Sequence, residues 1–178
     1  KNAQQGMPPF MKKGKFLYTH VTMVNFFTTN EQADSANRAE GVLAKPKIYK
    51  KQMEEIEKDI AGKKAQIDID SKIIEDYLAK NNIKAQKTNW GTYVAILTEG
   101  TGEKMDSRYI ATVNYTGRTL DSGFVFDSNT DPAFNHMQPY PVNLAELGGV
   151  ILGWSDALQQ MKKGTKATIF IPSSLGYG

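Results

Sequence analysis

Aromatic and branched apolar residues recur between residues 113 and 178, close to glycine-containing turns and with one carboxylate among them. They belong to five short motifs, in chain order Val113-Asn114-Tyr115-Thr116-Gly117, Phe126-Asp127-Ser128, Val150-Ile151-Leu152-Gly153-Trp154, Met161-Lys162-Lys163-Gly164 and Ile171-Pro172-Ser173-Ser174-Leu175-Gly176-Tyr177-Gly178. Side chains of these types can line a dry apolar pocket and supply a few hydrogen-bond donors. They suit a reaction that needs no nucleophile.

The residues that nucleophilic or metal chemistry requires are scarce. The chain has no cysteine, which excludes zinc thiolate sites and cysteine nucleophiles, and it has no glycine-rich phosphate loop. Its 2 histidines, His20 and His136, have no metal-ligand partner at a useful spacing. We therefore expect both to be ordinary strand or surface residues, and we predict no metal and no cofactor.

In this order and at these spacings the five motifs resemble the FK506-binding-protein (FKBP) family of peptidyl-prolyl cis-trans isomerases. The resemblance covers about residues 87–178. It implies an α+β fold in which an FKBP-like antiparallel sheet wraps around one short helix. It also implies an enzyme that catalyses rotation about X-Pro bonds in exported or unfolded polypeptides.

The chemistry of that rotation agrees with the residue types. Rotation is slow because amide resonance must be broken, at a barrier of ~18–20 kcal/mol. In the twisted transition state the amide is less polar than in its planar form. A dry apolar pocket therefore favours the transition state over the ground state.

The resemblance assigns roles to individual residues of the motifs. Trp154 corresponds to the floor of the proline pocket, and the backbone N–H of Ile151 and the hydroxyl of Tyr177 would bond substrate carbonyls. A further aromatic wall is expected at Tyr140, with Phe134 as its competitor. The residues expected to line the same pocket are Tyr115, Phe126, Asp127 and Val150. Family members often pair the aspartate with an arginine a few residues later, and residues 128–139 contain none.

The two ends of the chain suggest how the parent protein is organised. In the family, the L-G-Y-G turn at 175–178 leads into a Pro-Pro loop and a central strand, and Met7-Pro8-Pro9 with Leu17–Met23 resembles that piece. One explanation is tandem FKBP-like units; the other is an N-terminal strand that folds back or swaps between chains. We favour the first, because Thr19 stands where the family often has a pocket aromatic.

Residues 1–86 are expected to divide into an N-terminal strand and a helical arm. Residues 1–29 would be the tail of an upstream unit, with an isolated strand at 14–29. Residues 30–86 would form a polar linker and the arm, with Gly41 and Pro46 as breakers at 30–46. Helices are predicted over 47–65 and 71–80, the second capped by Asp70 or Ser71.

The second of these helices is predicted to turn Ile73, Ile74, Tyr77 and Leu78 inward. The apolar faces of the two helices could pack on each other or on the next domain. They could also form a dimerising or client-binding arm.

Residues 87–178 are expected to form the isomerase domain, without its last loop and strand. Strands are predicted at 93–97, 109–115 and 166–171, with a short helix within 150–161 that starts near Gly153 and Trp154. We expect these strands to lie mainly in one antiparallel sheet.

Composition limits the partners and the location. The net charge of +3 is too small to argue for nucleic acid, and no apolar run reaches the length of a membrane span. The resemblance implies proline-containing client polypeptides, and an envelope protein-export complex as a further partner. It also implies the periplasm or an outer-membrane anchor of bacteria. The alternatives are a weakly active or inactive FKBP-like chaperone or assembly subunit docked on such a complex, and a dimeric scaffold built on the arm.

Overall fold

The computed structural model describes residues 28–178 and divides the chain into two compact units, Lys1–Val42 and Leu43–Gly178. The predicted strand at 14–29 falls, up to residue 27, outside the described residues, as does the Pro-Pro piece that precedes it. The functional motifs all lie in the second unit.

Helix α1 spans Asn30–Gly62, so the prediction of a non-helical linker over 30–46 is wrong. Thr29 and Gln32 start the helix: the Thr29 hydroxyl accepts the Gln32 amide at 3.3 Å, and the Gln32 side chain accepts the Thr28 amide at 3.2 Å. Pro46 lies inside the helix. Relative to alanine, a glycine inside a helix lowers the stability of the helix by about 1 kcal/mol and a proline by about 3 kcal/mol. Good helix formers around such a residue can offset this loss.

Helix α2 spans Lys64–Lys80 and follows α1 after a single turn residue, Lys63. The predicted start at Asp70 or Ser71 is therefore wrong, because both residues lie inside the helix. Its buried stripe consists of Ile67, Ser71, Ile74 and Leu78. Ile73, predicted to face inward, is 57% exposed, because the stripe continues at a spacing of three and four from Ile67.

The rest of the second unit consists of short strands and one short α-helix. The strands are β1 (Gln86–Lys87), β2 (Tyr93–Thr98), β3 (Thr101–Lys104), β4 (Ile110–Val113), β5 (Thr116–Arg118), β6 (Val125–Ser128), β7 (Tyr140–Asn143), β8 (Lys162–Lys163) and β9 (Lys166–Phe170). The helices are η1 (Pro132–Phe134), α3 (Leu152–Leu158) and η2 (Ser173–Leu175). The α+β class and the elements predicted at 93–97, 150–161 and 166–171 are confirmed.

The described strands pair antiparallel, but not in the one main sheet that was expected. They form a three-stranded sheet, β1-β2-β9, and three two-stranded ladders, β3-β8, β4-β7 and β5-β6. The strand expected over 109–115 ends at Val113 for a local reason. The buried Asn129 side chain accepts the Tyr115 amide at 2.7 Å and donates to the Val113 carbonyl at 3.0 Å, which replaces ladder bonds at this point.

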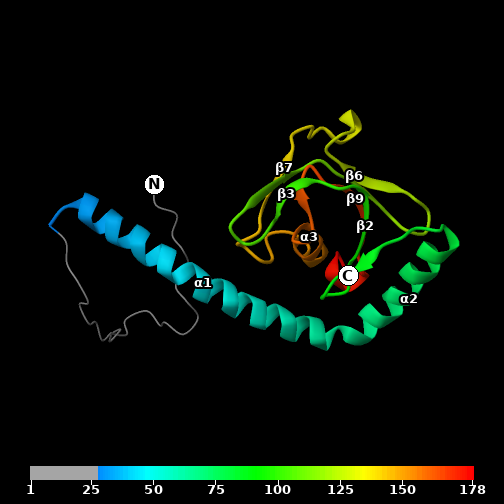
Figure 1. The fold of residues 1–178 in the computed structure, drawn as a ribbon, viewed down its shortest axis with the longest axis horizontal. Coiled ribbons are helices and arrows are strands. Elements are labelled where there is room, and N and C mark those ends of the chain that lie inside the picture. The colour runs from blue at the N-terminus through cyan, green and yellow to red at the C-terminus, as the bar shows by residue number, and fades with distance from the viewer. Residues whose placement is uncertain (1–27) are drawn as a thin grey trace, which may run out of the picture. The chain divides into compact units, whose positions relative to one another are not determined.

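The main hydrophobic core lies between α3 and the strands, which curve over the helix in Figure 1. Its buried residues are Val94, Ala111, Val142, Leu144, Ala157, Leu158 and Met161. Two further clusters attach α2: one joins Ile74 and Leu78 to Tyr93 and Phe170, and the other joins Ile67 to Trp90 and Leu175. Because these residues of α2 are buried against the strands and η2, tertiary packing stabilises the helix as part of the second unit.

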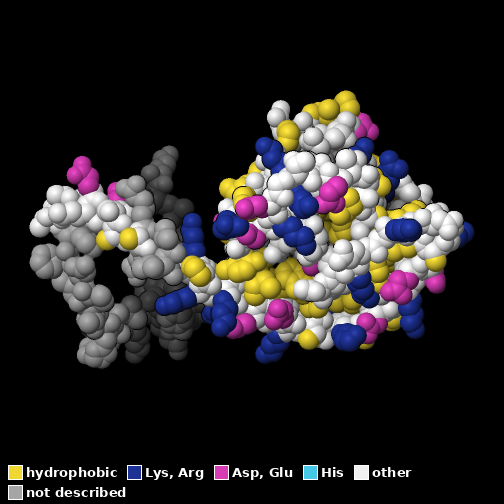
Figure 2. Space-filling view, in the orientation of Figure 1, with side chains coloured by type: hydrophobic (Ala, Val, Ile, Leu, Met, Phe, Trp, Pro, Cys, Tyr) yellow, Lys and Arg dark blue, Asp and Glu magenta, His cyan; other side chains and the backbone are white. Residues whose placement is uncertain are grey.

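The surface of the face shown in Figure 2 carries charges of both signs, with hydrophobic side chains gathered between them. No helix in residues 28–178 is long and apolar enough to cross a membrane.

Candidate active site

The site is built around Trp154, the third residue of α3. The ring of Tyr115 meets the indole edge-on, with centroids 4.9 Å apart and planes at 77°. The ring of Tyr140 meets it from β7 at 6.2 Å and 82°. The ladder β4-β7 sets this geometry, because Val113 lies opposite Tyr140 in its register. The indole packs on the main core, which anchors the floor of the cluster.

Tyr115 is tied to a carboxylate on the neighbouring strand. Its hydroxyl donates to Asp127 Oδ2 at 2.5 Å, while Asp127 Oδ1 is 2.7 Å from His136 Nε2. The tyrosine and histidine rings also lie near each other, with centroids 6.4 Å apart. The three side chains therefore form one hydrogen-bonded chain beside the indole.

The electrostatics of this chain follow from burial and from the shared carboxylate. Burial first, and the hydrogen bond to Asp127 second, raise the pKa of Tyr115 to about 12. That hydrogen bond, followed by the one from His136, lowers the pKa of Asp127 although burial opposes it. At neutral pH the tyrosine is thus a donor and the aspartate an acceptor.

His136 is a residue that sequence reasoning missed. We expected it to be an ordinary surface histidine, yet it bonds the aspartate for which no arginine could be found. No local pattern signals this, since the loop that contains η1 separates His136 from Asp127. Only the unpaired aspartate pointed to a missing partner. Asn129, which holds Val113 and Tyr115 in place, was missed for the same reason.

Phe126 and Tyr177 form a second aromatic pair. Their rings meet at 6.0 Å and 88°, and Tyr177 is 81% exposed. Phe126 packs over Gly117, where an added Cβ would lie 2.6 Å from the Phe126 ring. The glycine of the first motif thus makes room for the phenylalanine of the second.

Val150 and Ile151 precede α3 directly. Val150 packs against the same core as Trp154, and the Ile151 carbonyl accepts the Trp154 amide at 3.0 Å. Within residues 28–178 no hydrogen bond is formed by the Ile151 amide, which leaves it able to donate to another molecule. Phe134 lies in η1, and among the described rings Tyr140, not Phe134, is in contact with Trp154.

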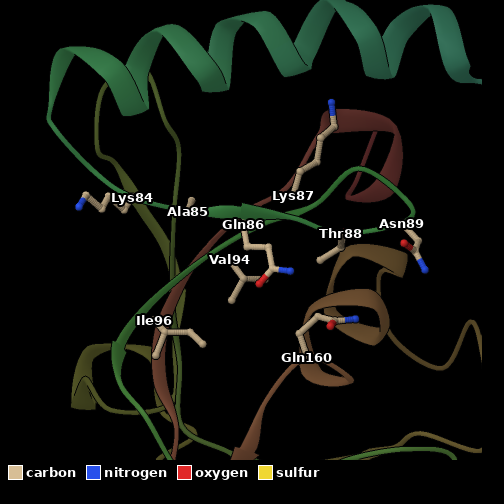
Figure 3. A pocket seen from close by; sticks show the side chains of 9 residues that line it. All are labelled: Lys84, Ala85, Gln86, Lys87, Thr88, Asn89, Val94, Ile96 and Gln160. Atoms are coloured by element: carbon tan, nitrogen blue, oxygen red, sulfur yellow. The ribbon is translucent and has the colours of Figure 1, made fainter.

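A cavity of about 430 Å³ opens elsewhere, beside β1 and β2. Figure 3 shows Gln86 and Gln160 on its inner side, whereas the amino groups of Lys84 and Lys87 point away from it. No predicted site residue lines this cavity. The aromatic cluster lies elsewhere, and its side chains Phe126, Tyr140 and Tyr177 are exposed. In the described part of the chain, no group of acids and histidines could hold a metal ion.

Comparisons with known proteins match the same region. The sequence pattern of the family "FKBP-type peptidyl-prolyl cis-trans isomerase" matches residues 101–178. An FK506-binding protein of Neisseria meningitidis serogroup B is 39% identical over 88 residues, which cover 49% of this chain and 75% of that protein.

Two longer relatives match as well. A probable FKBP-type isomerase, FkpA, of the same Neisseria strain is 33% identical over 130 residues, covering 73% of this chain and 44% of that protein. The outer membrane protein MIP of Legionella longbeachae is 36% identical over 88 residues, covering 49% of this chain and 34% of that protein. The chain thus spans less than half the length of these two relatives. On the motifs, the fold and the match to most of the FK506-binding protein, the chain belongs to the FKBP-type peptidyl-prolyl cis-trans isomerase family.

Proposed function

We propose that this chain is a peptidyl-prolyl cis-trans isomerase that binds proline on the face of Trp154. The observation that carries the proposal is the enclosure of this indole by two edge-on rings, Tyr115 at 4.9 Å and Tyr140 at 6.2 Å. Rings so arranged form a flat apolar floor with upright walls, which fits a pyrrolidine ring.

Each remaining residue has a role in this proposal. Phe126 and Val150 extend the apolar wall. The Ile151 amide and the Tyr177 hydroxyl hold the substrate backbone by its carbonyls. Asp127 accepts the Tyr115 hydroxyl and holds it at one position. This hydroxyl therefore needs no other acceptor in the pocket.

The reaction then needs no covalent step. The apolar walls exclude water from the X-Pro amide, so its planar, more polar ground state is disfavoured relative to the twisted transition state. The two donors keep the flanking backbone in place while the bond rotates.

The clients we propose are proline-containing polypeptides of the bacterial envelope. The location, periplasmic or at the outer membrane, is supported by the likeness to FkpA and to the outer membrane protein MIP. In this proposal residues 87–178 are the isomerase domain and residues 30–86 the arm.

A protease-coupled assay on an Ala-Pro peptide tests the function. We expect the chain to accelerate the slow isomerisation phase, which takes roughly 10–100 s without a catalyst. Tyr177→Phe combined with Trp154→Leu should remove most of that acceleration. Tyr109→Phe is the matched control, since its exposed hydroxyl contacts only Glu103 among the described residues. Equal rates for wild type and the double variant would refute the catalytic role.

The alternative is a chaperone or assembly subunit with little activity, docked on an envelope or secretion complex. The exposure of Tyr177, at 81%, favours it, because so open a wall excludes water poorly. Suppressed aggregation of an unfolded client without any acceleration of the Ala-Pro peptide would establish this function instead.

A further inference from the structure

The turn that carries Tyr177 is held by a side chain from the helical arm. Asp70, in the middle of α2, accepts two hydrogen bonds on Oδ2, from the Ser173 amide and the Ser173 hydroxyl, each at 2.7 Å. Its other oxygen accepts the side chain of Gln66, one helical turn earlier, at 2.8 Å. The carboxylate is therefore fixed from its own helix and directed at η2.

Asp70 supplies a cap that the turn cannot make for itself. The residue at the N-cap position of η2 is Pro172, which makes no side-chain cap bond. The first amide of the turn needs an acceptor from elsewhere. Burial raises the pKa of Asp70, but the bonds from Ser173 and Gln66 outweigh burial, and the pKa lies below its usual value.

The hydrogen bonds continue from Ser173 to both neighbours of Tyr177. The Ser173 carbonyl accepts the Gly176 amide and the Gly178 amide, each at 2.9 Å. Tyr177 itself is mostly exposed, and among the rings of the described residues only that of Phe126 contacts it. The direction of the Tyr177 ring thus depends on where the backbone of this turn is held.

An apolar contact holds the same turn from the same helix. Leu175, at 1% exposure, is buried with Ile67 of α2 and with Trp90. Polar and apolar contacts together fix both ends of η2 against α2.

We propose that Asp70 is a positioning residue of the active site: through Ser173 it orients the turn that presents the Tyr177 hydroxyl to the substrate. Helix α2 is then a working part of the catalytic unit. This inference rests on the proposed isomerase function.

The test is a double-mutant cycle in the protease-coupled assay. Asp70→Ala should lower kcat/KM on the order of tenfold, since a displacement of about 1 Å costs a catalyst that much or more. In a Tyr177→Phe background the same substitution should change kcat/KM less than about twofold, because the hydroxyl it positions is already gone. An equal fall in both backgrounds, or none in the wild-type background, overturns the inference.

Two further variants guard against simple loss of folding. Ser173→Ala removes only the hydroxyl bond and should give a smaller loss than Asp70→Ala, again confined to the background with Tyr177. Asp68→Asn is the matched control: it lies on α2, pairs with Lys64 at 2.7 Å, and should leave kcat/KM unchanged. If kcat/KM fell as much in Asp68→Asn as in Asp70→Ala, the loss would come from a less stable helix α2. That result would overturn the inference.

Hydrogen exchange separates this inference from the proposed function. The Gly176 amide should exchange faster in Asp70→Ala than in wild type, whether or not the chain is catalytic. Wild type could show no isomerase activity while the Gly176 amide still exchanges faster in Asp70→Ala than in wild type. The proposed function then fails, but the coupling between Asp70 and the turn stands. If wild type is active and exchange and kinetics are both unchanged, the coupling fails.

Discussion

At the scale of single residues, the site depends on one carboxylate shared by two side chains. The Asp127 side chain is one-third exposed, and at such exposure an ion pair with His136 alone would contribute little, because water screens the charges. Two hydrogen bonds of 2.5 and 2.7 Å, from Tyr115 and His136, hold it nonetheless. The aspartate therefore acts as a fixed acceptor that sets the tilt of the Tyr115 ring against Trp154.

The first prediction concerns this acceptor. Because the Tyr115 hydroxyl is the largest cause of the lowered pKa, Tyr115→Phe should raise the pKa of Asp127. The stability that Asp127 contributes is present above its unfolded pKa of about 3.9 and is lost as the pH falls through its lower folded value. In the variant the folded pKa lies closer to the unfolded value, so less stability should be lost and the loss should end at a higher pH. A carboxyl-carbon NMR titration measures the change, and an identical pKa in both proteins would contradict it.

The second prediction concerns His136. Its removal takes one hydrogen bond from Asp127, and such a bond contributes about 0.5–1.5 kcal/mol. His136→Ala should therefore lower kcat/KM roughly twofold to tenfold, and it should have no effect when Asp127 is already alanine. A loss of the same size in the Asp127→Ala background would show that His136 acts in another way.

The residues of the cluster differ in how far sequence revealed them. Tyr115, Phe126, Asp127, Trp154 and Tyr177 were named because each stands in a motif with fixed spacing. His136 and Asn129 were not, because their partners come from tertiary folding of a loop that has no motif. The catalytic roles of the named residues stay predictions.

At the scale of elements, the strand β5 shows how close packing shapes the site. Gly117 pairs with Asp127 across the ladder β5-β6, and the Phe126 ring lies over it. The third prediction is that Gly117→Ala displaces this ring, because an added Cβ would lie 2.6 Å from the ring. Overpacking of this kind costs about 1–3 kcal/mol.

The assay for Gly117→Ala compares two quantities in one variant. Thermal unfolding should show the loss of stability, and kcat/KM should fall at temperatures where the variant is fully folded. Gly123→Ala is a useful contrast because nothing lies within 4 Å of its added Cβ, although its φ of 68° adds backbone strain. That variant should lose stability but keep its kcat/KM. If folded Gly117→Ala has wild-type kcat/KM, Phe126 is not part of the pocket.

Among the features of the fold, the positions where helices begin were the hardest to predict from the sequence. Gly41 and Pro46 indicated a linker, whereas the capping pair Thr29 and Gln32 starts α1 well before them. Asp70 was expected to cap its own helix, as aspartates before apolar runs often do. It instead caps η2, because the helix is already buried upstream at Ile67. Local propensity cannot anticipate a partner 103 residues away.

At the scale of the whole molecule, helix α2 and the strands of the second unit share buried cores. Trp90 lies in the cluster with Ile67 and Leu175, and Trp154 packs against the core around α3. The two tryptophans therefore report on two different parts of one folded unit. Cores joined in this way are expected to unfold together.

The fourth prediction follows from this arrangement. In protein labelled with 5-fluorotryptophan, the fluorine signals of Trp90 and Trp154 should lose their folded intensity at the same denaturant concentration. Ile67→Ala should lower both midpoints equally, with a loss of about 2–5 kcal/mol for the cavity left in the core. A shift of the Trp90 signal alone would show that α2 detaches independently.

The fifth prediction concerns the central claim, that an X-Pro bond rotates on the face of Trp154. Exchange NMR of an Ala-Pro peptide in the presence of the protein observes the bond and the indole together. We predict cis–trans exchange cross-peaks at the peptide proline that are absent without protein. We also predict that the Trp154 indole N–H signal shifts more than that of Trp90. Binding that leaves the exchange rate unchanged, or faster exchange with an unperturbed Trp154 signal, would contradict the account.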